Sequence, residues 1–409
     1  MLVSWPNNWD LIDFPINLCG LKELEILDMR YNWVYELPQE IIKLEKLKYL
    51  NLLESYIQEI PDYLGNMENL EFLDLTKISA KDIQGIQEFP PNLCNLSTLK
   101  TLVIYGGGIS TLPEGIEKLS SLQRLDLSSH QISKLPESIG NLSSLKFLDL
   151  GWNQLEKLPE SIGNLASIRN LNLSCNKITT LPNSIGNLKE IEVLYLSDNQ
   201  LESIPESIES LKSLKELAIS ENNLTEFPKE ICSLINLEKF YLGSNRFTTL
   251  PEEIGNLNSL KWLEMRNSKF ERLPTSLGDL DSLHNLEISD AEINKLPKSL
   301  LQLDELSNIY VDNKIDQYGT YEERKIGLKN QIEGIEKRIK QLNSIDLKNE
   351  YQKSLAIQSL EIKIKILNLE IANLREEKYY RKYPTILKKL KDKGVRIIFR
   401  NCTSVFPHI

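Results

Sequence analysis

The feature that most constrains the fold is a proline that returns at a fixed interval along most of the chain. Each of these prolines follows a bulky apolar residue, and every interval is 23 residues except the one from Pro61 to Pro90, which is 29. The prolines stand at positions 15, 38, 61, 90, 113, 136, 159, 182, 205, 228, 251, 274 and 297. A period of this length predicts one small structural unit per repeat, with each unit stacked on the next, so that a single globular core is not needed.

The internal pattern of one period predicts a short strand and a short helical segment. The unit from Leu158 to Pro182 reads LPESIGNLASIRNLNLSCNKITTLP. Apolar and polar residues alternate in the middle of each unit, as at Leu194 and Leu196, which indicates a strand. The preceding PESIGNL segment has apolar residues three apart over one or two turns. We therefore expect a curved parallel sheet inside and short helical turns outside.

An asparagine stands near the end of the predicted strand in the central units. Its side-chain amide can bond backbone groups of its own turn and the next, which would form a ladder along the stack. Five consecutive units supply it, at Asn153, Asn176, Asn199, Asn222 and Asn245. Other residues replace it at Ser55, Ile78, Gly107, His130, Ser268, Ala291 and Lys314. The centre of the stack is therefore predicted to be more regular than its two ends.

These units resemble leucine-rich repeats of the LPxxIGNLxxLxxLxLxxNxL type, over about three quarters of the chain. The resemblance implies an α/β solenoid. Among proteins with such units, the chain is similar in style to the intracellular Ras-group leucine-rich-repeat scaffolds. That likeness implies a protein that holds protein partners without catalysis. It also implies a Ras-like small GTPase or its regulator as one class of partner.

The 29-residue interval interrupts the regular period. Its six additional residues predict a bulging loop over residues 79–87, and Gly106, Gly107 and Gly108 follow in the next unit. A glycine-rich loop holds phosphate when a lysine and a helix start come after it, as in a P-loop. No GK[ST] sequence follows here. The glycine triplet is interpreted as a turn rather than as a nucleotide site.

The tail has a different pattern. Between residues 320 and 383 the apolar residues are spaced alternately by three and four, which predicts two helices. The polar residues Asn343, Ser344 and Asp346 favour a turn, and hence an antiparallel helical hairpin. Pro384, Leu387 and Leu390 then repeat the spacing of the earlier units, followed by a predicted strand. We predict three regions: a solenoid of about thirteen units over 1–319, a hairpin or coiled-coil insertion over 320–383, and a resumed last repeat over 384–409 that caps the sheet.

The second predicted helix carries a spare apolar row, at Ile362, Ile366 and Leu369. Such a row needs a contact surface. Two alternatives remain open at this point: the row packs on the solenoid of its own chain, or it forms a homodimer with the hairpin of a second chain.

Composition and charge restrict the class of protein. The five cysteines form no CxxC pair, the start lacks a secretory signal pattern, and no run of 18 apolar residues occurs. We expect a soluble cytoplasmic protein without disulfides or a membrane segment. From residue 321 onward 20 Lys and Arg face 11 Asp and Glu, which leaves 28 against 47 before it. The basic tail suggests nucleic-acid binding as a minor hypothesis, but the acidic solenoid argues against it.

Residues between the buried leucines of each strand should project from the inner surface, so that one position per unit gives a row across it. One row runs from Asp126 to Tyr310 and its neighbour from Arg124 to Asn285. Aromatic residues with Arg often anchor protein interfaces, and acidic residues favour a basic partner. The alternative is that these are scattered surface side chains. The candidate partner-binding residues are Arg124, Asp126, Phe147, Asp149, Trp152, Tyr195, Lys239, Tyr241, Trp262, Glu264 and Glu287.

Catalysis has little support in the sequence. His130, His284 and His408 have no carboxylate or cysteine at metal-ligand spacing, and Cys402 has no visible catalytic partner. Asp126 with Asp149 is better explained as surface than as an acid/base pair. We expect no enzyme activity, no cofactor and no metal. The leading hypothesis is an interaction scaffold. The alternative is the recognition module of a GTPase, kinase or ubiquitin-ligase system whose catalytic part is on another chain.

Overall fold

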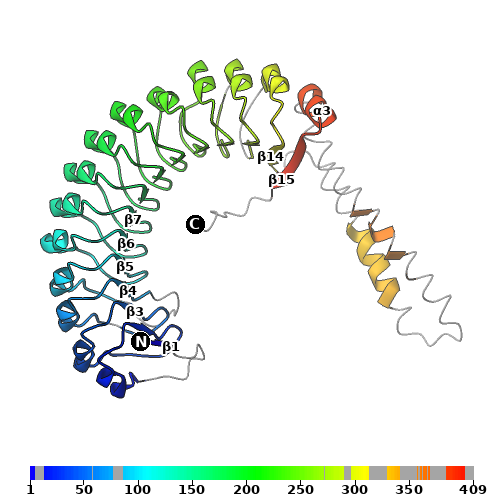
Figure 1. Cartoon of the computed structure of the whole chain (residues 1–409). Coiled ribbons are helices and arrows are strands. Elements are labelled where there is room, and N and C mark those ends of the chain that lie inside the picture. Colours follow the sequence, from blue (N-terminus) through cyan, green and yellow to red (C-terminus); the bar gives the residue numbers. More distant parts are fainter. Residues whose placement is uncertain are drawn as a thin grey trace, which may run out of the picture.

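A computed structural model of the chain forms an open arc, with strands along its inner edge and short helical turns along its outer edge (Figure 1). The structure describes residues 1–4, 13–57, 59–76, 86–270, 272–289, 296–312, 329–340, 357, 360–361, 363–365, 367–368 and 384–400. The expected bulging loop over 79–87 lies outside these ranges apart from residues 86 and 87.

The inner edge of the arc is one sheet. Its strands are β1 (Leu2–Ser4), β2 (Ile26–Asp28), β3 (Tyr49–Asn51), β4 (Phe72–Asp74), β5 (Thr101–Val103), β6 (Arg124–Asp126), β7 (Phe147–Asp149), β8 (Asn170–Asn172), β9 (Val193–Tyr195), β10 (Glu216–Ala218), β11 (Lys239–Tyr241), β12 (Trp262–Glu264), β13 (Asn285–Glu287), β14 (Asn308–Asp312) and β15 (Arg396–Arg400).

The outer edge consists of five-residue 3-10 turns and one α-helix. The turns are η1 (Ile16–Gly20), η2 (Gln39–Lys43), η3 (Asp62–Asn66), η4 (Pro91–Asn95), η5 (Glu114–Lys118), η6 (Glu137–Asn141), η7 (Glu160–Asn164), η8 (Asn183–Asn187), η9 (Glu206–Ser210), η10 (Lys229–Ser233), η11 (Glu252–Asn256), η12 (Thr275–Asp279) and η13 (Lys298–Gln302); the helix is α3 (Pro384–Asp392).

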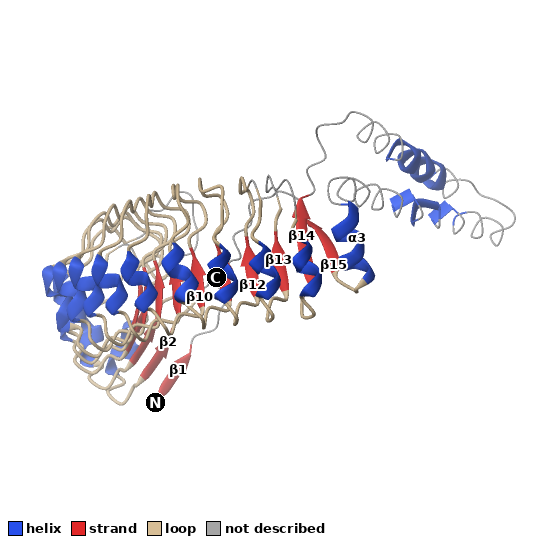
Figure 2. Ribbon diagram, turned by 90° about the horizontal axis from the view of Figure 1, so that it is seen from above, coloured by secondary structure: helices blue, strands red, loops and turns tan. Residues whose placement is uncertain are grey.

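All strands are parallel and lie in sequence order, so the sheet is open at both ends. Each residue pairs with the residue one repeat later, as Leu148 with Leu171. The longer interval leaves this register intact, because Leu73 pairs with Leu102 across it. The parallel sheet with helical turns outside confirms the fold predicted from the repeat pattern (Figure 2).

The proline that marks each repeat begins the helical turn. In the unit of η7, Ile162 donates its N–H to the carbonyl of Pro159 at 3.1 Å, and Leu165 donates to the carbonyl of Ile162 at 3.2 Å. Pro159 itself has extended backbone and donates nothing, so its missing N–H costs no helical bond. Ile162 and Leu165 are fully buried beneath the turn. The repeat proline thus fixes where the outer turn starts.

The asparagine ladder predicted for the central units is present. The side-chain amide nitrogen of Asn176 donates to the carbonyls of Leu150 at 2.9 Å and Leu173 at 3.0 Å. Its side-chain oxygen accepts the N–H of Leu155 at 2.9 Å. The residue before it, Cys175, has a φ of 58°, a left-handed conformation that turns the chain toward the amide. Asn153, Asn199, Asn222 and Asn245 make the same set of bonds.

The C-terminal residues extend the same sheet. β15 pairs with β14 over five residues, and α3 packs beside η13 with Leu387 and Leu390 buried in the common core. Lys393 donates to the carbonyl of Leu301 at 2.8 Å. Residues 329–340 are helical, as predicted for the first helix of the insertion. The turn between the two predicted helices lies outside the described residues, so the hairpin and any dimer through it stay predictions.

Within the part of the chain that the structure describes, no helix is both long enough and apolar enough to cross a membrane.

Candidate protein-binding surface

The register of the sheet places the predicted surface residues side by side on the concave surface, meaning the inner face of strands β6 to β14. Asp126 pairs with Asp149, and Tyr241 with Glu264, in consecutive strands of one row. The neighbouring row is continuous in the same way, from Arg124 to Phe147 at one end and from Lys239 to Trp262 at the other. The strands that carry both rows lie on the inside of the arc, opposite the helical turns (Figure 1).

The carboxylates of the first row close the ends of their own strands. Asp126 accepts the backbone N–H of Ser128 at 3.2 Å and its hydroxyl at 2.7 Å. Asp149 accepts the N–H of Gly151 at 2.9 Å, and the side-chain amide of Asn172 donates to it at 3.0 Å. These bonds hold the bend in which the chain leaves the sheet. Asp126 is only 9% exposed, in contrast to the open flank expected for a basic partner.

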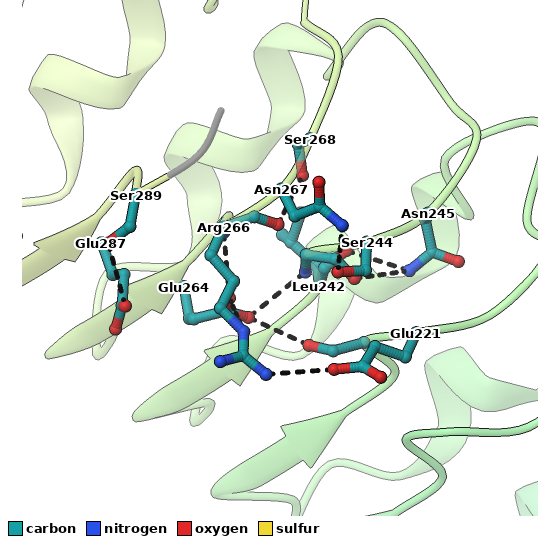
Figure 3. Close-up of polar contacts among 12 residues, drawn as sticks. Glu221, Leu242, Ser244, Asn245, Glu264, Arg266, Asn267, Ser268, Glu287 and Ser289 are labelled. Atoms are coloured by element: carbon teal, nitrogen blue, oxygen red, sulfur yellow. Dashed lines mark hydrogen bonds and ion pairs between the residues drawn. The ribbon is translucent and has the colours of Figure 1, made fainter. Parts of the chain in front are cut away.

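Glu264, with a longer side chain, also accepts a hydrogen bond from the backbone N–H two residues later (Figure 3). One of its oxygens accepts the N–H of Arg266 at 2.9 Å, and the other accepts the hydroxyl of Ser220 at 2.9 Å. Arg266 also donates to Glu221 at 3.0 Å. Burial raises the pKa of Glu264 to about 7, although the nearby Arg266 guanidinium lowers it. Glu264 and Glu287 are 5% and 3% exposed, so most of each carboxylate is turned away from solvent.

Aromatic side chains form the open part of this surface between β9 and β14. The Tyr195 hydroxyl donates to one oxygen of Glu216 at 2.9 Å, and Lys239 donates to the other at 3.0 Å. The rings of Trp262 and Tyr310 pack with their centroids 5.3 Å apart. All three aromatic rings are partly buried rather than fully exposed. They present broad apolar faces beside charged and polar groups, the combination that protein interfaces favour.

The Tyr241 hydroxyl lies in a negative environment. Burial, followed by the charges of Glu216, Glu264 and Glu287, raises the pKa of Tyr241 well above its ordinary value. The phenol therefore stays protonated at neutral pH and keeps a hydroxyl donor.

A second aromatic group stands on β7 and the turn after it. The Arg124 guanidinium lies 3.7 Å from the ring centre of Phe147 and donates to Asp126 at 3.2 Å. Trp152, in contrast, is 51% exposed and has a φ of 52°. A bulky side chain is rare in this left-handed conformation, which is strained. The side-chain hydrogen bonds of Asn153 to the same turn offset the strain.

Comparison with known proteins identifies the repeats. The family model described as a leucine-rich repeat region matches residues 7–105, 87–173, 160–250, 186–267 and 248–393. The chain is a leucine-rich-repeat protein. No curated protein matches this leucine-rich-repeat protein in sequence.

Solved structures of other leucine-rich-repeat proteins are similar. A leucine-rich-repeat protein of Leptospira interrogans is 32% identical, with a TM-score of 0.70 over 75% of this chain and 77% of that one. The plant peptide hormone receptor RGFR1, in complex with RGF2, is 25% identical, with a TM-score of 0.58 over 73% of this chain and 54% of that one. An internalin from Listeria monocytogenes shares the fold at 22% identity, with a TM-score of 0.60 over 71% and 81% of the two chains.

Three residues of this surface were not among the candidate partner-binding residues selected on sequence, although Glu216 and Tyr310 stood in the two predicted rows. Glu216 joins Tyr195 to Lys239, Tyr310 packs on Trp262, and Arg266 bridges two glutamates. The sequence alone could have pointed to Arg266, because the same repeat position holds only Ser or Gly in the units from Ser128 to Gly243. No sequence feature pointed to the packing of Tyr310 on Trp262, because strand β13 lies between their strands.

The described residues offer no metal site, since no group of three His, Cys, Asp or Glu side chains could hold an ion among them. Cys19, Cys94 and Cys232 are buried, each as a small side chain within the stack. Burial raises the pKa of the Cys94 thiol to about 11, which leaves it a weak nucleophile at neutral pH. Cys402 and His408, for which the sequence gives no catalytic or metal-binding partner, lie outside the described part of the chain.

The Asp149 carboxyl should make stability depend on pH. Burial, and then the charge of Asp126, raise its pKa to about 6. A raised folded-state pKa adds stability below the unfolded value of about 4, and this contribution is lost as pH rises toward 6. We expect Asp149→Asn, which keeps the acceptor for Gly151, to remove a fall of roughly 1–3 kcal/mol in unfolding free energy between pH 4 and 6. Urea unfolding of both proteins at several pH values measures it, and parallel curves for the two proteins would contradict it.

Proposed function

We propose that this leucine-rich-repeat protein binds another protein, or a peptide segment of one, on its concave surface. The observation that supports the proposal is that Phe147, Tyr195, Tyr241 and Trp262 are partly exposed on strands of one sheet, with the exposed Trp152 in the turn after β7. Such rings supply apolar area at little entropic cost and are frequent anchors of interfaces. The candidate residues predicted from the sequence, from Arg124 to Glu287, belong to this proposed site.

The proposed surface divides into two contact regions with polar residues between them. Phe147 and Trp152 belong to the first region, and Tyr195 begins the second. Asn170, Asn172 and the small Ser174 lie between them. Because parallel strands are about 4.8 Å apart, Phe147 and Trp262 are separated by roughly 24 Å along the sheet. This length suits a protein surface or an extended segment better than a small molecule.

The proposed class of partner rests on the chemistry of the surface and on the similarity of this chain to other leucine-rich-repeat proteins. A neighbour of the same fold, RGFR1, is in complex with RGF2, which supports a protein or peptide ligand for this chain as well. The Ras-group resemblance of the sequence implies a small GTPase or its regulator. The contacts described above favour no such partner over another protein. Binding without catalysis is part of the proposal, as is a cytoplasmic location, which the free thiols at Cys19, Cys94, Cys175 and Cys232 support.

The decisive experiment is affinity purification of the full chain against the double variant Tyr195→Ala with Tyr241→Ala. We expect the variant to lose the specific partner, with binding weakened at least tenfold, because truncating two interface aromatics commonly costs more than 1.4 kcal/mol. Both residues are partly exposed, so the fold should survive. Circular dichroism and an unfolding curve check this.

The matched control replaces two residues of the convex side, Glu137→Ala with Glu160→Ala, which begin the turns η6 and η7. This control should retain every partner. If instead the concave variant retains them all and the convex control loses one, the concave surface is not the binding site.

A further inference from the structure

Ion pairs on the concave surface place the cation toward solvent and the carboxylate beneath it. The side chains of Arg124 and Asp126 are 43% and 13% exposed, with 3.2 Å between the guanidinium nitrogen and the carboxylate oxygen. The side chains of Lys239 and Glu216 are 50% and 16% exposed, with 3.0 Å between the ammonium nitrogen and the carboxylate oxygen. In both pairs the outermost charge is therefore positive.

Arg266, in the turn after β12, repeats this order (Figure 3). Its side chain is 28% exposed, whereas that of Glu264 beneath it is 6% exposed. The same guanidinium bonds Glu221 at 3.0 Å, a turn residue whose side chain is 36% exposed. Asp198, in the turn after β9, is exposed as well. The more open carboxylates of this region thus lie in the turns, beside the strands that carry the cations and the aromatic rings.

Ion pairs on the flank that precedes the strands are arranged differently. Lys261, just before β12, is 53% exposed and its partner Glu238 is 39% exposed. Lys100, just before β5, is 51% exposed and its partner Glu71 is 39% exposed. On this flank both charges reach solvent, so an approaching group meets both. On the concave surface the carboxylate is covered, so an approaching group meets the cation first.

Two of the concave cations stand beside an aromatic residue of the next strand. Arg124 pairs in register with Phe147, and its guanidinium lies 3.7 Å from the centre of that ring. Lys239 pairs in register with Trp262. Five strand spacings separate Arg124 from Lys239, about 24 Å along the sheet. An extended segment of about seven residues covers this distance.

The carboxylates beneath the cations carry less negative charge than their number suggests. Burial raises the pKa of Asp149 to about 6 and that of Glu264 to about 7. At neutral pH about half of the Glu264 carboxyls are therefore protonated. This reduces the repulsion that an acidic group would meet at the surface.

We propose that the concave surface binds an acidic segment of its protein partner, whose aspartate or glutamate carboxylates pair with Arg124 and Lys239. Apolar residues of the same segment pack on the aromatic rings beside these cations. This inference rests on the proposed concave binding and specifies the charge of the partner. It reverses the basic partner expected from the number of acidic residues, because a residue count does not show which charge reaches the surface.

The charge of the partner is tested by selection of random peptides on the full chain. The probe is a phage-displayed library of peptides of about 12 residues, long enough to span the two cations. We expect the enriched peptides to contain Asp and Glu at least about twice as often as Lys and Arg. No enrichment, or enriched peptides without an acidic excess, would overturn the proposal.

Fluorescence polarisation with one enriched, labelled peptide then measures the role of the two cations. Arg124→Gln with Lys239→Gln should weaken binding about tenfold, whereas Arg124→Lys with Lys239→Arg, which keeps both charges, should weaken it less than about threefold. The matched control, Lys100→Gln with Lys261→Gln, removes two equally exposed cations of the flank and should change binding less than about twofold. Equal losses for the two glutamine pairs would show a response to net charge alone and would overturn the proposal.

A further variant separates the charge of the partner from the site itself. Tyr195→Ala with Tyr241→Ala should also weaken binding of the peptide, because it removes aromatic area from the same surface. If this pair abolishes binding and Arg124→Gln with Lys239→Gln leaves it unchanged, the concave site stands and the acidic segment does not. If neither pair weakens binding, both proposals fail. Full displacement of the peptide by a single-stranded oligonucleotide at equal concentration would assign the cations to phosphate recognition and would also overturn the acidic segment.

Discussion

Replacing Asn176 by alanine is expected to lower the unfolding free energy by about 4 kcal/mol, because buried polar groups left without partners cost about 1–3 kcal/mol each. The substitution removes the donors to Leu150, Leu173 and Ser174 and the acceptor for the N–H of Leu155. Asn176 is buried, so water cannot easily replace these bonds. The left-handed turn at Cys175 also loses its support.

Guanidinium unfolding and hydrogen exchange measure this effect. Exchange should rise first at the backbone amides of Leu155 and the flanking units, because each unit of a solenoid is stabilised mainly by its neighbours. The matched control is Lys177→Ala, next to the asparagine and exposed, which should change stability by less than about 0.5 kcal/mol. A loss below 1 kcal/mol for Asn176→Ala would mean that the ladder contributes little.

Replacing Gly163 by alanine is expected to cost about 3 kcal/mol, as overpacking of a tight contact usually does. The new Cβ would lie 2.2 Å from the carbonyl oxygen and 2.6 Å from the Cβ of Ser184. The oxygen belongs to backbone, so it cannot move aside as a flexible side chain does. The turns η7 and η8 must therefore separate, and the strain should spread along the stack.

Thermal unfolding checks this result, with Cys232→Ala as the control at the same repeat position. A Cβ is already present at Cys232, so alanine there removes only a sulfur atom and should cost about 1 kcal/mol. Equal losses for the two variants would contradict the close contact of glycine and serine.

The fold could be predicted from the sequence because the same 23-residue unit occurs many times. A 23-residue period fixes the register of every strand, so Tyr241 and Trp262 could be placed on adjacent strands of one face before any coordinates were available. The ladder at Asn153 to Asn245 followed for the same reason. These predictions depend only on position within the unit, and position within the unit is what a periodic sequence displays.

The role of each side chain on that face was harder to predict. Asp126 and Glu264 were expected to face a partner, yet both bend back to accept backbone N–H groups and are largely buried. Whether a carboxylate closes its own turn or faces outward depends on the length of its side chain and on the neighbours from adjacent units. Arg266 shows the influence of both side-chain length and neighbouring units, since its long side chain reaches Glu221, two units away.

The most direct test of the account is photo-crosslinking from the concave surface. A benzophenone amino acid replaces Tyr241, and in a second protein it replaces Glu160 on the convex turn η7, in the native cellular setting. The account predicts that one protein partner is captured covalently from position 241 and not from position 160. Capture of that partner from position 160, with none from position 241, would contradict it.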